Sequence, residues 1–187
     1  MDYGKFGPLS FLVGDWVSKG WTGENKAPDP DREEENTKFK QKMSFVPIDD
    51  VENHEQVLCV LRYSTMAWEE GDDDPFHEEV GYWIWDAENK QVMKSFIVPR
   101  GISVNAGGTS ASNAKSFKVQ AKVGSDTYGV ASNLFLDREF KTIQYDLEVT
   151  QLDASTFSYS EDTQIKMKGR TDIFHHTEKN TLVKILK

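Results

Sequence analysis

The sequence predicts an all-β protein: a single antiparallel up-and-down β-barrel of about ten strands over residues 1–187, with a short N-terminal helix closing one end. Apolar residues recur at every second position in many segments, as in strands with one buried face. The linkers are short and rich in Asp, Asn, Gly and Ser, which suits antiparallel hairpins rather than crossover helices. A chain of 187 residues can also bury a core without disulfide or metal crosslinks.

The N-terminal helix is predicted from the stretch "GPLSFLVGD". Pro8 occupies a first-turn position, where its missing N–H costs nothing. Leu9, Leu12 and Val13 fall on one side, and Gly14 is a typical terminator. We therefore expect a helix of about two turns that packs its apolar side against the barrel.

Strands are predicted most clearly in three segments, residues 37–45, 116–123 and 142–150, where apolar and polar side chains alternate. Their expected inward faces consist of Phe39, Gln41, Met43, Phe45, Phe117, Val119, Ala121, Val123, Ile143, Tyr145, Leu147 and Val149. The other expected strands are shorter, apolar on both faces or less regular, and include residues 15–21, 57–63, 81–86, 91–98, 156–169 and 181–186. The charged residues 24–37 are expected to form a mobile loop.

A meander of strands without a helical layer must bury its apolar face on itself, and closure into a barrel also removes the exposed edges. A barrel of more than about eight strands leaves an interior cavity. In "GYWIWD" the aromatic residues Tyr82, Trp83 and Trp85 lie side by side. We expect one parity of this strand to line the cavity and the other to be covered from outside; the alternative is that these aromatics only fill the core.

Composition excludes several classes of partner. The formal charge is −9, from 22 Lys and Arg against 31 Asp and Glu, so nucleic acid is not an expected partner. No segment reaches the roughly 18–20 apolar residues of a membrane span, and the N-terminus lacks a signal-peptide pattern. The single Cys59 favours a reducing compartment, so a cytoplasmic location without membrane insertion is predicted. The acidic residues 68–79 match no calcium loop and are expected to form a solvated hairpin tip, so no metal site is predicted.

Four motifs carry a resemblance to a known family: "FLVGDWVSKG", "FHEEVGYWIWD", "IVPRGISVNAGGT" and "FHHTEKNTLVKI". In this order, and over residues 8–187, the chain resembles the nitrobindin-like family of heme-binding-like β-barrels, relatives of the fatty-acid-binding proteins in the calycin group. The resemblance implies a ten-stranded barrel closed at one end by an N-terminal turn of helix. In nitrobindins a histidine near the start of the last strand ligates a ferric heme, linked to nitric oxide binding and peroxynitrite isomerisation.

The sequence departs from this family at the heme ligand. Aligning "NTLVKILK" with the family's last strand places Thr181 where the histidine is expected, and threonine is not an axial ligand of heme iron. His175 and His176 lie upstream, before or within the turn into that strand. The resemblance therefore predicts the fold and the cavity, whereas a bound heme remains only a possibility.

The long alternating segment 156–169 supplies the main polar candidates for the lumen. Unbroken alternation points Tyr159, Glu161 and Thr163 inward. A buried carboxylate needs a cationic or hydrogen-bonding partner, and Arg100 or Arg62 is the candidate for Glu161. The alternative is a β-bulge that shifts the parity and sends Glu161 to solvent.

Further candidates are Gln41, which is inward and polar, and His77 and the 175–176 histidine pair, which are expected near a barrel mouth. The predicted ligand-binding set consists of Trp16, Tyr82, Trp83, Arg100, Tyr159, Glu161 and His176.

The leading function predicted is an intracellular β-barrel that binds a small hydrophobic or amphipathic molecule, because such pockets are largely aromatic with a few fixed polar groups. The alternative is a heme-binding, nitrobindin-like protein. No Ser-His-Asp, Cys-His or zinc-type arrangement can be assembled from the motif spacing, so a binding protein is favoured over an enzyme. A filled, purely structural barrel is a third possibility.

Overall fold

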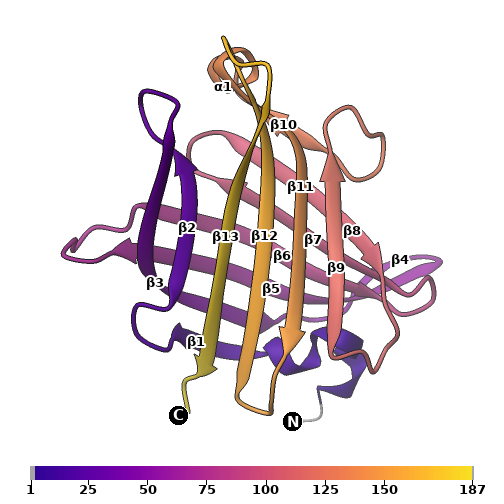
Figure 1. Ribbon diagram of the computed structural model, residues 1–187. Helices are drawn as coiled ribbons and strands as arrows, with labels where there is room; N and C mark the ends of the chain where they lie inside the picture. The colour runs from indigo at the N-terminus through magenta and orange to yellow at the C-terminus, as the bar shows by residue number, and fades with distance from the viewer. Residues whose placement is uncertain (1–2, 187) are drawn as a thin grey trace.

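The computed structural model describes residues 3–186, which form a closed antiparallel barrel (Figure 1). Its strands are β1 (Gly14–Ser18), β2 (Gly23–Pro28), β3 (Glu34–Pro47), β4 (Val51–Asn53), β5 (Gln56–Glu69), β6 (His77–Asp86), β7 (Gln91–Val98), β8 (Ile102–Thr109), β9 (Ser116–Lys122), β10 (Val130–Ser132), β11 (Phe140–Gln151), β12 (Thr156–Met167) and β13 (Ile173–Lys184).

The barrel has ten strand positions in the described part of the chain. The ring runs β3, β2, β13, β12, β11, β9, β8, β7, β6, β5 and closes through the antiparallel pairing of β5 with β3. Strands β1 and β2 share one position, because each pairs with both β3 and β13. Strands β4 and β10 lie off the ring, on β5 and β8. The predicted ten-stranded antiparallel barrel is confirmed, but residues 24–37 form β2 and the start of β3 rather than a mobile loop.

Two-residue alternation positions the side chains of the lumen. Strand β12 pairs with β13 from Thr156 to Lys166 without a register shift, so the predicted alternation of this strand is confirmed. The β11–β12 ladder shifts register between Thr142 and Gln144. Thr142 is therefore buried and Ile143 only partly so, and the inward position predicted for Ile143 is wrong.

The N-terminal helix is a 3-10 segment, η1 (Gly4–Leu12), at the end of the barrel opposite α1 (Leu134–Glu139) in Figure 1. It buries Phe6, Leu9 and Leu12. Gly7 interrupts it with φ of 55°, and a Cβ there would lie 2.5 Å from the indole nitrogen of Trp85. The backbone of η1 thus packs directly on the ring of Trp85, close to the end of β6.

Helix α1 was not predicted. Its six residues are capped by the Asn133 side chain, which accepts a hydrogen bond of 3.0 Å from the Leu136 backbone N–H. Neither η1 nor α1 is long and apolar enough to cross a membrane, and these are the helices of residues 3–186.

The apolar core fills the η1 end of the barrel. Phe157 lies at its centre, with the ring of Trp16 edge-on at 4.7 Å, and with Phe11 and Phe45 at 6.1 and 6.3 Å between ring centroids. Such edge-to-face contacts add to the stabilisation from area burial. Beyond Phe157 along β12, the inward residues become polar, and this change of character creates the candidate site.

Candidate ligand site in the barrel lumen

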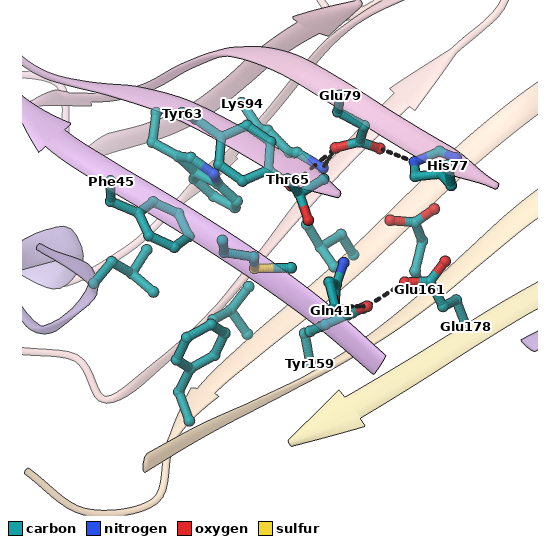
Figure 2. A pocket seen from close by; sticks show the side chains of 16 residues that line it. Gln41, Phe45, Tyr63, Thr65, His77, Glu79, Lys94, Tyr159, Glu161 and Glu178 are labelled. Carbon is teal, nitrogen blue, oxygen red and sulfur yellow. Dashed lines mark hydrogen bonds and ion pairs between the residues drawn. The ribbon is translucent and has the colours of Figure 1, made fainter. Parts of the chain in front are cut away.

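A cavity lies inside the barrel where the apolar core meets a cluster of polar side chains (Figure 2). The volume of this cavity is about 30 Å³. The space is therefore narrow. Its lining comes from η1, β3, β5, β6, β7, β11, β12 and β13, and consists of Leu12, Gln41, Met43, Phe45, Tyr63, Thr65, His77, Glu79, Trp83, Lys94, Leu147, Val149, Phe157, Tyr159, Glu161 and Glu178.

One end of the cavity is apolar. Its walls include Met43, Phe45, Leu147 and Phe157, all buried. Trp83 completes this end; it is 3% exposed, and its indole Nε1 is buried without a hydrogen-bond partner. A buried donor without an acceptor is costly, so this N–H is a position where a bound molecule or water can gain a hydrogen bond.

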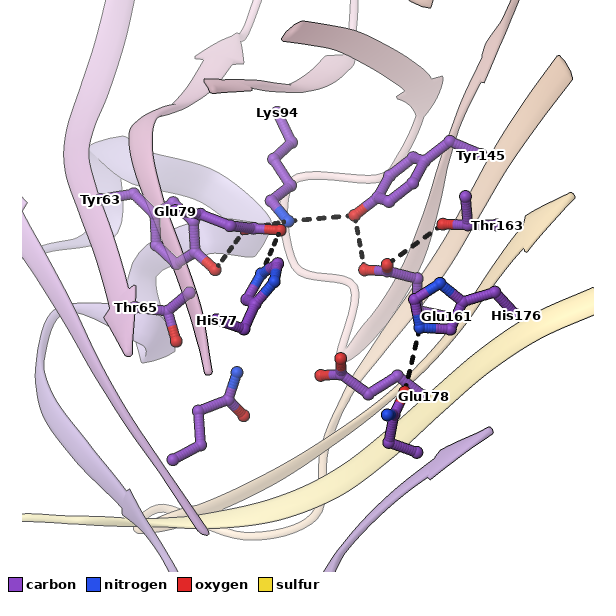
Figure 3. Close-up of polar contacts among 12 residues, drawn as sticks. Tyr63, Thr65, His77, Glu79, Lys94, Tyr145, Glu161, Thr163, His176 and Glu178 are labelled. Carbon is purple, nitrogen blue, oxygen red and sulfur yellow. Dashed lines mark hydrogen bonds and ion pairs between the residues drawn. The ribbon is translucent and has the colours of Figure 1, made fainter. Parts of the chain in front are cut away.

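The opposite end contains a buried ion pair. Lys94 lies between Val92 and Phe96 on the inward face of β7, and its Nζ is 2.9 Å from Glu79 Oε2. The Tyr63 hydroxyl donates to the same oxygen at 3.0 Å, and Lys94 also donates to the Tyr145 hydroxyl at 3.0 Å (Figure 3). Both charges are thus paired and hydrogen-bonded, which is what burial of an ion pair requires.

The ion pair sets the protonation state of Glu79 and of the adjoining His77. Burial alone would raise the pKa of Glu79, but Lys94 and His77 lower it to about 2. His77 Nε2 lies 3.4 Å from Glu79 Oε1. Burial lowers the pKa of His77, yet Glu79 more than offsets this and the net shift is upward. Glu79 is therefore an anion at neutral pH, paired with the Lys94 ammonium group and in contact with His77.

Glu161 and Glu178 face the cavity from neighbouring strands. They are directly opposite each other in the β12–β13 ladder. Tyr145 donates to Glu161 Oε2 at 2.8 Å, and the Tyr159 hydroxyl contacts Glu178 Oε1. Burial, together with Glu178 and Glu79 and against the effect of Lys94, raises the pKa of Glu161 to about 7. Burial also raises the pKa of Glu178.

A neutral hydrogen-bond network holds the β3 side of the cavity. Gln41 Oε1 lies 2.8 Å from the Tyr159 hydroxyl and accepts from Asn180 Nδ2 at 3.3 Å. Asn180 Nδ2 also donates to Ser18 Oγ at 2.8 Å. The Gln41 carbonyl is therefore fixed, which directs the rest of its amide toward the lumen (Figure 2).

The structure brings Gln41, His77, Trp83, Tyr159 and Glu161 together around this cavity. For Gln41, Tyr159 and Glu161 the inward parity is the one predicted from the sequence. Their role in ligand binding stays a prediction.

Tyr82 and Trp16 do not line the cavity. Tyr82 points outward from β6 and is 45% exposed, so the prediction that it faces the interior is wrong; within "GYWIWD" only the Trp83 parity is inward. Trp16 is buried in the core, where it donates to the Leu12 carbonyl at 2.6 Å and packs on Phe157.

The expected arginine partners of Glu161 are also wrong. Arg62 lies on the outer face of β5. Arg100 is exposed in the β7–β8 turn, where its carbonyl accepts from Asn133 Nδ2 at 2.7 Å. The cation nearest to Glu161 through hydrogen bonds is Lys94, by way of Tyr145.

His175 and His176 lie within β13, not before it or in the turn that leads into it as predicted, and they take opposite faces of the strand. His176 is on the inward parity but outside the cavity lining, with Nε2 3.0 Å from Asn25 Oδ1. Burial lowers the pKa of His176 to about 4, helped by His77 and Arg100. His175 is exposed and contacts Asp162 at 2.7 Å. Neither has its side chain within the cavity.

Sequence reasoning missed Glu79, Lys94 and Glu178. A signal existed for two of them, since Lys94 interrupts an apolar strand at the parity of Val92 and Phe96, and Glu79 shares the parity of Trp83. Glu79 belongs to the acidic residues 68–79, which were expected to form a solvated hairpin tip; this expectation is wrong for Glu79, which is buried in β6.

Residues 5–184 match the THAP4-like, heme-binding β-barrel domain. The chain belongs to this family. The match confirms the resemblance to heme-binding-like barrels carried by the sequence motifs. Comparison with curated protein sequences finds no match. Among solved structures, the crystal structure of Rv2717c from M. tuberculosis is similar, with a TM-score of 0.64, 18% sequence identity and 95% of each chain covered, which supports the fold.

The lumen of this THAP4-like barrel does not fit a heme. The free space is too narrow for a macrocycle, and a charged pair and two further carboxylates border it. Thr181, which the sequence alignment placed at the family's ligand position, lies on the outward parity of β13, between the buried Asn180 and Leu182, so this alignment does not locate an inward-facing ligand. The interior therefore suits a ligand that is smaller than a heme and polar at one end.

Proposed function

We propose that this THAP4-like barrel is a binding protein that holds one small, slender amphipathic molecule in its lumen. The observation that supports the proposal is the division of one narrow cavity into an apolar end around Phe45 and Phe157 and a polar end around Glu161 and Glu178. Ligand pockets commonly combine a mostly apolar lining with a few fixed polar groups. The cytoplasmic location predicted from the sequence remains part of this proposal.

The apolar end of the cavity provides most of the affinity for this ligand. Moving one CH₂ group from water into apolar surroundings contributes about 0.8 kcal/mol, so a four-carbon chain gains roughly 3 kcal/mol. The carboxyl groups of Glu161 and Glu178 orient the polar part of the molecule. A branched or fused-ring ligand has no room in the narrow space.

We also propose that η1 closes the apolar end of the lumen. Leu12, the last residue of η1, lines the cavity, and Phe11 packs at 6.1 Å on Phe157. Ligand then enters from the opposite end, past Glu178 and the half-buried His176. This direction of entry brings the polar part of the ligand to rest beside the carboxylates.

Three four-carbon probes test the proposal: 1-butanol, n-butylammonium and butyrate. Methyl-resolved NMR should show that at least one of them shifts the signals of Leu12, Leu147 and Val149, which line the cavity. Val149→Phe fills the space and should abolish the shifts. Val80→Phe, on the exposed outer face of β6, is the matched control and should retain them. The proposal fails if no probe shifts the three residues, or if Val149→Phe binds as well as Val80→Phe.

A further inference from the structure

Two glutamates share one small patch of the inner wall. Glu161 and Glu178 are cross-strand partners in the β12–β13 ladder, and both line the cavity. Side chains directly opposite in an antiparallel pair have Cβ atoms about 5 Å apart, and like charges in such a pair destabilise the sheet. Figure 3 shows the two carboxyl groups on the same side of the lumen, Glu178 below Glu161. Such a pair is neutralised either by protonation, which the raised pKa of both carboxyl groups favours, or by a bound cation.

No lysine, arginine or histidine among residues 3–186 makes an ion pair with either carboxylate. The hydrogen-bond donors on Glu161 are the hydroxyls of Tyr145 and, at 3.4 Å, Thr163. The contact of Glu178 is the Tyr159 hydroxyl. Lys94 is already held by Glu79 and Tyr145. The pair therefore retains free acceptor positions that open to the cavity.

A second, independent feature of the same cavity indicates a ligand. Trp83 is 3% exposed and lines the cavity, yet its indole N–H has no acceptor. The indole is a donor, and an ammonium group cannot accept its hydrogen bond, so a water or an acceptor elsewhere on a ligand would have to complete it. Protein interiors rarely leave such groups unpaired, unless a water or a bound molecule completes them.

We propose that Glu161 and Glu178 together bind the primary ammonium group of the amphipathic ligand, whose aliphatic part extends toward Phe157. This inference rests on the proposed function and names the chemical class of the ligand. A primary ammonium has three donors, enough to bridge two carboxylates at once. Its charge relieves the repulsion between them, whereas an anion would add to it and a neutral alcohol would leave it unrelieved.

The four-carbon probes separate this inference from the proposed function. At pH 8 n-butylammonium is charged, as a lysine side chain is. Calorimetric titration should show that it binds at least tenfold more tightly than 1-butanol, with butyrate weaker than both. Equal or tighter binding of 1-butanol or butyrate would overturn the inference and leave the proposed function standing. If none of the three binds, both fail.

Isosteric variants locate the ammonium group. Glu161→Gln and Glu178→Gln should each weaken n-butylammonium binding at least tenfold and change 1-butanol binding less than threefold. Glu78→Gln, on the exposed face of β6 next to Glu79, is the matched control and should change neither. Circular dichroism confirms that each variant is folded. Unchanged ammonium binding in both lumen variants, or tight binding of calcium chloride in place of the ammonium probe, would contradict the inference.

Binding should also depend on pH. The groups that face the two carboxyls are Tyr63 on β5, His77 and Glu79 on β6, Lys94 on β7, Tyr145 on β11, Tyr159 on β12 and His176 on β13, while β3 contributes the neutral Gln41. Glu161 has a pKa of about 7 and loses its proton between pH 6 and pH 8. Affinity for n-butylammonium should rise several-fold over this range in the native protein. A flat profile in the native protein, or the same rise in Glu161→Gln, would count against the site.

Discussion

Lys94 and Glu79 are side chains of opposite charge held inside a barrel, where either one alone would be unstable. Their side chains are only 4% and 7% exposed, and the contact of 2.9 Å is supported by Tyr63 and Tyr145. Loss of one partner leaves the other charge buried and unpaired, which costs more than the pair itself contributes. The pair therefore dominates the energetics of single substitutions in the lumen.

Lys94→Met should lower the free energy of unfolding by roughly 3–5 kcal/mol at pH 7, because Glu79 is left as a buried anion. Urea denaturation measures the change. The double variant Lys94→Met/Glu79→Gln should recover part of the loss, since no buried charge then remains unpaired. A Lys94→Met protein as stable as the native one would show that the pair is not buried as described.

Glu161→Gln should change the pH dependence of stability. The pKa of Glu161 in the folded protein is about 7, raised above the ordinary value of 4.5. The folded state therefore holds more protons than the unfolded state between these values, and stability falls as pH rises from 4.5 to 7. Removing the carboxylate should raise the free energy of unfolding on the order of 1–3 kcal/mol at pH 8 and have little effect at pH 4.

Urea titrations at pH 4 and pH 8 test this, with Glu78→Gln as the exposed control on β6. A gain at pH 4 as large as that at pH 8 would contradict the assignment. So would a loss at pH 8 without any ligand present.

Among the elements, the packing of η1 depends on close contact between its backbone at Gly7 and the ring of Trp85. Gly7 adopts a positive φ of 55°, and its α-carbon faces the Trp85 indole so closely that a methyl group would overlap it. Phe6, the residue before Gly7 in η1, is buried in the core. Glycine at this position therefore allows the N-terminal helix to pack on the barrel.

Gly7→Ala should destabilise the protein by about 1–3 kcal/mol, since the new methyl group displaces Trp85 and alanine disfavours the positive φ. Gly20→Ala separates the two effects, because Gly20 also has a positive φ of 79° but nothing within 4 Å of its Cβ position. Thermal denaturation should show the larger loss for Gly7→Ala. Equal losses would mean that backbone conformation alone, and not contact with Trp85, accounts for the effect.

Several elements could be predicted because their alternation is regular. Strand β12 keeps one parity from Phe157 to Met167, so Tyr159 and Glu161 were placed correctly from the sequence. The bulge near Ile143 is hidden in a two-residue pattern, because Ile143 is apolar and has the same parity as Tyr145 and Leu147. Helix α1, with six residues, is too short to show a helical period.

At the scale of the whole molecule, the barrel could be predicted from many alternating strands joined by short turns. The match to the THAP4-like β-barrel family agrees with this prediction. The partner of Glu161 could not be predicted in this way. Lys94 lies four strand positions from β12 around the ring, and only the closed barrel brings its ammonium group to Tyr145 and thus to Glu161. Arg100 and Arg62 were chosen by residue type, without knowledge of the parity that turns them outward.

Purified protein mixed with hemin should show no strong Soret band of a histidine-ligated heme. The cavity is too small for the macrocycle, and neither His175 nor His176 of β13 lines it. Absorption spectra with and without added hemin provide the measurement. A strong Soret band that is lost in His175→Ala or His176→Ala would overturn this prediction and favour the heme-binding function of the family.

The most direct test of the lumen as a ligand site is the indole N–H signal of Trp83 in a ¹⁵N NMR spectrum, assigned by Trp83→Phe. This N–H is buried beside the cavity without an acceptor, whereas Trp21 and Trp68 contact Lys40 and Lys42. Addition of n-butylammonium at pH 8 should shift the Trp83 signal in a saturable way and leave those of Trp21 and Trp68 in place. A Trp83 signal that stays fixed while the probe is added to saturation, or that moves only together with the other two, would contradict a ligand site in the lumen.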